Sequence, residues 1–189
     1  MIELRPLNWA NIEKHYEWNN DEELNYYDSD FPYEKESFES FKTRFKALHH
    51  PGNTKAGIFE IIHKENNELI GIVDFHSIDL INKRCFLEIT IAVEKYRNKG
   101  YGKDALKKAL YHCFNVMKLN KVSTSSFDFN ASWINLVARV GFKQEGTLRQ
   151  HVFKRGKYHD KLIYGLLAEE YANSTMYMEP AREAAYSQG

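Results

Sequence analysis

The sequence predicts an α+β fold in which a central, mostly antiparallel sheet is flanked by helices. Three strand-like runs joined by short turns lie before the middle of the chain, the pattern of an antiparallel meander. Apolar residues at helical spacing occur both before and after this meander. The chain has 189 residues, about one domain's worth. We therefore expect one domain over residues 1–171, with 172–189 as a C-terminal tail that docks as a helix or frays.

The N-terminal part predicts a short strand, a helix, a loop and a second helix. Residues 2–6 form the strand, and Asn8 or Asn11 is a candidate cap for the helix that follows. Residues 19–34 are rich in Asn, Asp and Tyr and predict a loop. Phenylalanines at helical spacing predict a helix over residues 38–48, with its aromatic stripe packed in the core.

The meander occupies the middle of the chain. Residues 57–63 and 68–76 are β-rich runs joined at Asn66-Asn67, a good turn pair. Asn82-Lys83 marks a second turn, and residues 85–93 form the third run. Sequential strands joined by short turns pair antiparallel.

The second half alternates helices and strands. We expect an amphipathic helix from near Lys103, a strand over 121–127, a short helix from Asn130 to before Gly141, and a hairpin of 146–153 with 161–167.

Composition excludes several classes of function. Lysine plus arginine equals aspartate plus glutamate at 26 each, which argues against a general nucleic-acid binder. Cys85 and Cys113 lack a zinc-ligand spacing to histidines, so we expect no metal and two buried thiols. With no signal peptide and no long apolar run, we expect a cytoplasmic protein without membrane contact.

The most informative stretch is Arg97-Asn98-Lys99-Gly100-Tyr101-Gly102, between a strand-like run and a helix start. Two glycines let backbone N–H groups approach a ligand closely. The helix start adds unpaired N–H groups and partial positive charge. Together with the side-chain cations, these features predict an anion cradle for phosphate or pyrophosphate.

Two better-known phosphate loops fit this stretch poorly. A Walker loop needs glycine where Arg97 stands and Ser or Thr where Asp104 stands. The dinucleotide fingerprint has its first glycine pair at Gly100 and Gly102, with a tolerated alanine third. A Rossmann loop, however, lies in the first βα turn of its domain, whereas here a meander precedes it.

The order of these motifs resembles the GNAT N-acetyltransferase superfamily. Arg97, Gly100 and Gly102 match its phosphate loop, [Q/R]-x-x-G-x-[G/A]. Residues 130–142 look like its block Asn-x-x-[Ser/Ala]-x-x-x-[Tyr or other]-x-[Lys/Arg]-x-Gly-Phe. The resemblance covers roughly residues 2–171 and implies a GNAT-like sheet whose splayed strands form an acyl-CoA cleft.

Three further segments resemble particular branches of that superfamily. Trp18-Asn19-Asn20-Asp21, Glu145-Gly146-x-Leu148-Arg149 and Tyr158-His159-Asp160 look like ribosomal-protein N-terminal acetyltransferases and polyamine acetyltransferases. Two positions depart from the family pattern. Trp133 replaces a small residue, and Val137 replaces the tyrosine that protonates the departing thiolate in many members.

The resemblance implies an enzyme that moves an acetyl group from acetyl-CoA to a primary amine. The backbone of the loop would hold the CoA pyrophosphate, a backbone N–H around Ile91 would stabilise the oxyanion, and Asn130 would bond the cofactor or a water near the sulfur. The implied cofactor-binding residues are Ile91, Ala92, Val93, Arg97, Asn98, Lys99, Gly100, Tyr101, Gly102 and Asn130.

Glu88 is the candidate general base. A protonated amine must lose a proton before it attacks, and Glu88 lies inside the apolar run Phe86-Leu87-Glu88-Ile89. A carboxylate there is costly unless it is partnered or used; the alternative is a salt-bridged or edge-exposed glutamate. For the acid, Tyr158, Tyr164, Ser132 and solvent stay open.

The sequence does not decide which molecule accepts the acetyl group. We expect a protein N-terminus, with a small amine such as a polyamine, amino sugar or amino acid as the alternative, and a silent acyl-CoA-binding regulator as a third reading. The acidic segment 21–39 either lines a pocket for a cationic substrate or is a solvated surface. Because dimers are common among similar proteins, a homodimer is a further expectation.

Overall fold

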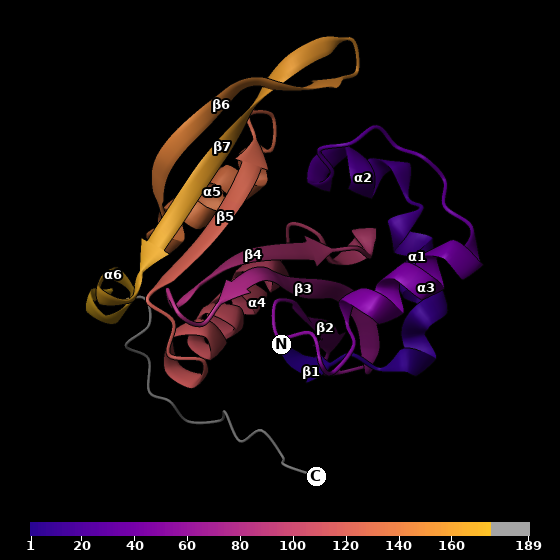
Figure 1. Ribbon diagram of the computed structural model, residues 1–189, viewed down its shortest axis with the longest axis horizontal. Helices are drawn as coiled ribbons and strands as arrows, with labels where there is room; N and C mark the ends of the chain where they lie inside the picture. Colours follow the sequence, from indigo (N-terminus) through magenta and orange to yellow (C-terminus); the bar gives the residue numbers. More distant parts are fainter. Residues whose placement is uncertain (175–189) are drawn as a thin grey trace.

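The computed structural model describes residues 1–174 and has a seven-stranded sheet at its centre (Figure 1). The strand order is β1-β2-β3-β4-β5-β7-β6. Every neighbouring pair is antiparallel except β4 and β5, which run parallel. The α+β class predicted from the sequence is confirmed.

The strands are β1 (Ile2–Pro6), β2 (Gly57–His63), β3 (Glu68–Asp79), β4 (Arg84–Ile91), β5 (Lys121–Phe127), β6 (Lys143–Lys154) and β7 (Lys157–Leu167). The helices are η1 (Trp9–Asn11), α1 (Ile12–Asn19), α2 (Glu22–Asp28), α3 (Phe38–Leu48), η2 (Glu94–Tyr96), α4 (Tyr101–Tyr111), the π-helical η3 (His112–Val116), α5 (Ala131–Val140) and α6 (Ala168–Asn173).

The larger core lies between the sheet and the helices α4 and α5. Leu87 of β4, Leu106 and Leu110 of α4, Val122 of β5 and Val137 of α5 are fully buried in it. A smaller core on the opposite face joins α1 and α3 to β2 and β3. The sheet is therefore covered on both faces, and a different set of helices packs on each face (Figure 1).

The predicted meander, the 38–48 helix, the strand over 121–127, the helix after Asn130 and the C-terminal hairpin are all confirmed. The turn before β3 has Asn67 in the left-handed region at φ 55°, which Asn tolerates well. Cys85 and Cys113 are buried thiols with their sulfurs 3.8 Å apart. Of the predicted tail, residues 172–174 lie at the end of α6, and 175–189 lie outside the described residues.

The loop predicted for residues 19–34 is wrong in part, because α2 forms within it. Asp21 caps this helix by accepting the N–H of Leu24 at 3.0 Å, and two glutamates follow in its first turn. Carboxylates at a helix start offset its dipole and its unpaired N–H groups. The acidic composition that predicted a solvated loop is therefore also the start signal of a helix.

The end of β4 also differs from the prediction. The strand stops at Ile91, two residues early, because Ala92 and Val93 both donate their N–H groups to the Ile70 carbonyl, at 2.9 and 3.1 Å. Two donors on one acceptor break the ladder as a bulge does. This break turns the chain away from the sheet and toward the loop 97–102.

The close approach of β3 to β4 at Gly71 is a testable constraint. A Cβ atom on Gly71 would lie 2.1 Å from the Thr90 carbonyl oxygen, so Gly71→Ala must move one strand. We expect it to lower the free energy of unfolding by about 2 kcal/mol, measured by urea denaturation. Gly57→Ala on β2 is the control, since nothing lies within 4 Å of its added Cβ. Equal stability of the two variants would contradict this account.

Candidate active site

The two parallel strands at the centre of the sheet separate partway along their length. β4 and β5 pair only at Arg84↔Lys121, Cys85↔Val122 and Phe86↔Ser123, although both strands continue beyond. From there a V-shaped opening lies between the far halves of β4 and β5 (Figure 1). The splayed strands expected from the sequence resemblance are therefore present.

The backbone of β4 directs hydrogen-bonding groups into this opening. Ala92 donates its N–H across to β3, and in an antiparallel pair successive residues alternate between the two edges of a strand. The amides of Ile89 and Ile91 therefore point away from β3, toward β5, which no longer pairs there. An extended ligand placed in the opening would find these groups as a neighbouring strand would.

The loop 97–102 begins α4 beside this opening. Asn98 and Gly100 both lie in the left-handed region, at φ 58° and 88°, and Gly100 occupies the N-cap position. Alternating backbone of this kind turns successive N–H groups to one side and makes an anion-binding concavity. The open space around Gly100 and the exposed Lys99 side chain fit a pyrophosphate at this position.

Two side chains of the loop have structural partners. The Arg97 guanidinium donates to the carbonyls of Ile91 and Ala92 at 2.9 and 2.8 Å. The Tyr101 hydroxyl lies 3.1 Å from the His63 ring nitrogen. Arg97 therefore holds the end of β4 in place, and at Tyr101 only the backbone N–H is left for a cofactor.

The start of α5 lies on the other side of the opening. Asn130 caps it, with its side-chain oxygen accepting the Trp133 N–H at 3.2 Å. Trp133 packs against the main core, and Val137 is fully buried. A cofactor contact from Asn130 would therefore come from its amide nitrogen, and the Val137 position supplies no proton donor.

Glu88 lies on the face of β4 opposite α4, beside a second carboxylate and a histidine. Asp74 is its cross-strand partner on β3, and His76 Nε2 lies 3.7 Å from its Oε1. The His76 ring stacks on Phe86 at 4.8 Å, which fixes it beside Glu88. The Glu88 carboxylate raises the pKa of His76, and burial together with the Glu88 charge raises the pKa of Asp74 to about 6.

Helix α2 covers this group from across the opening. Thr90, two residues beyond Glu88 on the same face, donates its hydroxyl to Asp28 at the end of α2 at 2.9 Å. Asp28 is an exposed residue, yet the atoms packed around its carboxylate desolvate it and raise its pKa to about 6, with a further contribution from Glu88. Three carboxylates, Asp28, Asp74 and Glu88, therefore converge on one side of the splay.

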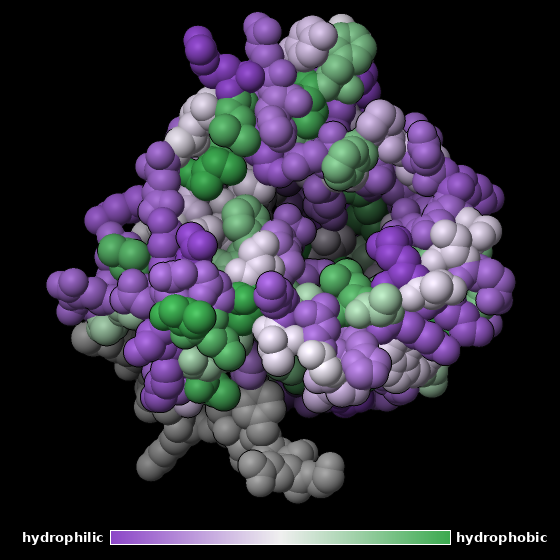
Figure 2. Space-filling model, viewed as in Figure 1, coloured by the Kyte–Doolittle hydropathy of each residue, from purple (hydrophilic) through white to green (hydrophobic). Residues whose placement is uncertain are grey.

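The hairpin of β6 and β7 holds α2 from the other side. Lys154 donates to the carbonyls of Asn25 and Tyr26 at 3.1 and 2.9 Å, and Arg155 pairs with Glu23 at 2.7 Å. The Tyr26 ring stacks on Phe129, with centroids 4.6 Å apart. The same view in space-filling form shows a hollow between β4, β5 and α2 (Figure 2).

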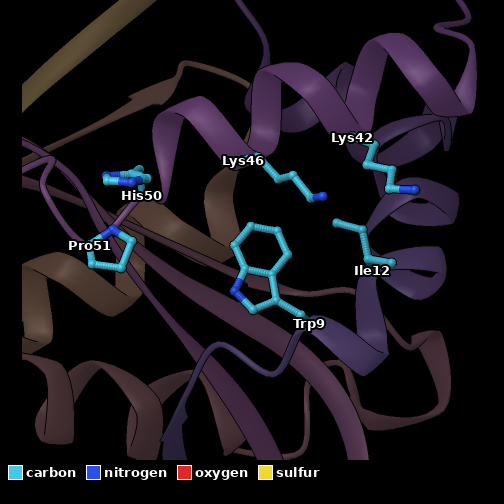
Figure 3. Close-up of a pocket in the computed structure, with 6 residues that line it drawn as sticks. All are labelled: Trp9, Ile12, Lys42, Lys46, His50 and Pro51. Atoms are coloured by element: carbon cyan, nitrogen blue, oxygen red, sulfur yellow. The ribbon is translucent and has the colours of Figure 1, made fainter.

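A separate groove of about 480 Å³ lies between α1 and α3, away from the splay. Its lining residues come from η1, α1, α3 and the turn that follows α3 (Figure 3). They are Trp9, Ile12, Lys42, Lys46, His50 and Pro51. None of them is a predicted site residue, so this groove is distinct from the candidate active site.

Sequence reasoning singled out Glu88 and the loop, offered the acidic segment 21–39 that contains Asp28 as one lining of a cationic pocket, and missed Asp74 and His76. The Asn82-Lys83 turn alone does not place them, because it pairs Asp79 with Arg84 and a bulge between His76 and Asp79 then shifts the register by one residue to set Asp74 opposite Glu88. Asp28 comes from the region predicted as a loop, and no local pattern places it over β4. Among residues 1–174, no three His, Cys, Asp or Glu side chains are grouped to hold a metal ion. In the same part of the chain, no helix has the length and apolar character to cross a bilayer.

We expect Arg97→Lys to weaken CoA binding about tenfold. Lysine keeps the charge but cannot make both hydrogen bonds to the carbonyls of Ile91 and Ala92, so the end of β4 loosens. Calorimetric titration with CoA measures the effect, and Arg139→Lys on the exposed side of α5 is the control. If Arg97→Lys binds as tightly as wild type, charge alone is needed at this position.

Comparisons with known proteins agree with this geometry. The crystal structure of spermidine N-acetyltransferase from Vibrio cholerae, in complex with CoA and spermine, superimposes with a TM-score of 0.83 at 25% sequence identity. It covers 91% of this chain and 98% of that one. The spermidine N(1)-acetyltransferase of Vibrio cholerae serotype O1 is 26% identical over 172 residues, 91% of this chain and 96% of that protein.

A third relative is the SPbeta prophage-derived uncharacterized N-acetyltransferase YokL of Bacillus subtilis, which is 30% identical over 108 residues. That match covers 57% of this chain and spans 60% of the length of YokL. The family model for the acetyltransferase (GNAT) domain matches residues 2–143. The chain therefore belongs to the GNAT acetyltransferase family, and the acetyl-CoA-dependent acyltransferase predicted from the sequence is the enzyme class of that family.

Proposed function

We propose that this protein transfers the acetyl group of acetyl-CoA to the primary amine of a small cationic molecule. The observation that carries the proposal is the convergence of Asp28, Asp74 and Glu88 beside the splay of β4 and β5. Carboxylates in a partly desolvated pocket attract an ammonium group and disfavour an anionic acceptor. The two near-full-length similarities to spermidine acetyltransferases also support a small molecule over the protein N-terminus expected first.

Each residue of the site has a separate task in this reaction. Acetyl-CoA supplies the acetyl thioester, and the loop 97–102 would hold its pyrophosphate by backbone N–H groups. The Ile91 amide would donate to the oxygen that gains charge when the amine attacks, an interaction typically worth about 10²–10³ in rate. Glu88 would accept the proton that the acceptor ammonium must lose before attack.

His76 gives Glu88 a defined orientation and a route for the proton. Its ring is held by Phe86, and its side chain is 38% exposed, so it reaches both Glu88 and solvent. The Glu88 side chain is itself 45% exposed, so its proton also has direct access to water. Since Val137 excludes the usual tyrosine, the thiolate would take its proton from solvent or from another hydroxyl near the opening.

The proposal is tested by thiol release from acetyl-CoA over a panel of acceptors, with Glu88→Gln beside the wild type. The panel contains alkyl monoamines, spermidine, an amino sugar, an amino acid and peptides that begin with Ser, Ala or Thr. We expect turnover with a small amine and not with the peptides, and a fall in kcat of about 10²-fold in Glu88→Gln. The CoA dissociation constant should stay unchanged.

Glu65→Gln, in the exposed turn between β2 and β3, is the matched control. Turnover on peptides alone would indicate that the acceptor is a protein N-terminus. CoA binding without turnover on any acceptor would favour the silent acyl-CoA binder. Normal turnover of Glu88→Gln would remove Glu88 from the role of base. The homodimer expected from the sequence stays a prediction, which light scattering tests.

The pH dependence follows from the carboxylates of the pocket. Asp74 has its pKa raised to about 6, so it is neutral below that pH and charged above it. A cationic acceptor should therefore bind better as pH rises, with kcat/KM increasing between about pH 5 and about pH 7. Asp74→Asn should make this rise smaller and leave the part contributed by Asp28, whose pKa is also raised to about 6.

Asp79→Asn, at the far end of β3, is the control for that profile. Hydrogen bonds from Asn82 lower the pKa of Asp79, so it stays charged throughout the range. Superimposable profiles for Asp74→Asn and wild type would contradict the assignment of the pH step to Asp74.

A further inference from the structure

Two lysines of the β6–β7 hairpin lie in surroundings typical of a binding site for an ammonium ligand. The Lys154 amine donates to the Asn25 and Tyr26 carbonyls and lies 4.9 Å from the Phe127 ring and 5.5 Å from the Tyr26 ring. Carbonyl oxygens and aromatic faces together form the cages that proteins use to bind organic cations. Here the cation in such a position is the Lys154 ammonium group of the chain itself.

Lys161 occupies a second place of the same kind. Its amine lies 2.5 and 2.7 Å from the two carboxylate oxygens of Asp30 and 5.9 Å from the Phe127 ring. Its side chain is 17% exposed, which is low for a lysine. The two ammonium groups thus share the Phe127 ring, at the end of β5 where the splay is open.

These lysines are close to the carboxylates of the proposed acceptor pocket. The positive charge of Lys154 acts on Asp28, and that of Lys161 acts on His76 beside Glu88. Asp28 is bonded to Thr90, two residues from Glu88. A chain-like acceptor that places one amine at Glu88 and extends toward the hairpin would therefore meet Lys154 and Lys161 with its next positive charge.

We propose that Lys154 and Lys161 determine acceptor specificity by filling, with their own ammonium groups, the place that a second ammonium group of a longer acceptor would take. The inference rests on the proposed function and narrows its substrate class to compact monoamines. A polyamine is disfavoured twice, because its second charge is repelled and because the acceptor groups for that charge are already bonded. Removal of one lysine amine would leave carbonyls and ring faces free for an external ammonium.

Lys154→Met tests this directly, since methionine keeps an unbranched stem and removes the ammonium group together with its two hydrogen bonds to α2. Calorimetric titration with spermidine should give a dissociation constant about tenfold lower for the variant than for the wild type. The ratio of the propylamine KM to the spermidine KM should rise about tenfold, whereas a mere loosening of α2 would raise both KM values together. Methylammonium should raise the Tm of Lys154→Met more than that of the wild type, because the variant offers a second place for an ammonium group besides the acceptor pocket.

Lys161→Met is the second variant, and Lys157→Met, an exposed lysine of the same hairpin, is the control. Unchanged or weaker spermidine binding in both folded variants would overturn the inference. So would a wild-type enzyme that prefers spermidine to propylamine, a result that needs no variant to fold. Because binding and Tm are measured without turnover, failure of the acetyl transfer itself would be seen separately in the thiol-release assay.

Discussion

The site depends on one constraint, which is that β4 and β5 stop pairing after Phe86↔Ser123. Parallel strands normally exchange evenly spaced hydrogen bonds along their whole length. Here the groups beyond that pair are left for a ligand, while the core behind them stays closed because Val122 and Leu87 pack against α4 and α5. The opening is therefore a gap in the hydrogen-bond ladder of the sheet and leaves its hydrophobic layer intact.

Two devices keep the gap in a defined shape. On the β4 side, the Arg97 guanidinium bonds the carbonyls of Ile91 and Ala92, so the last residues of the strand cannot fray. On the β5 side, Asp128 accepts hydrogen bonds from the His159 ring and the Asp160 N–H, which anchors the turn before Asn130. In both places a side chain bonds to a backbone group or to a charged group. Such directional bonds fix the local geometry more closely than apolar packing would.

Most of the strands and helices could be predicted from the sequence because the signals for them are local. Period-two runs and turn pairs such as Asn66-Asn67 locate strands, and Gly100 marks the helix start by its need for positive φ. The acceptor side could not be predicted in this way. Asp28, Asp74 and Lys154 come from three distant segments, and their common position depends on how α2 docks on the sheet. The α2 helix was not predicted, because a helix start that is capped by carboxylates has the same composition as a solvated acidic loop.

The attachment of α2 has a consequence for the thermodynamics of the enzyme. The helix is bonded to β4 through Asp28 and Thr90, and to the β6–β7 hairpin through Lys154 and Arg155, so it spans the two sides of the opening. A ligand that moved α2 would therefore act on both strands that flank the opening. If such a movement coupled the proposed acceptor to acetyl-CoA, linkage would require each of them to change the affinity of the other by the same factor.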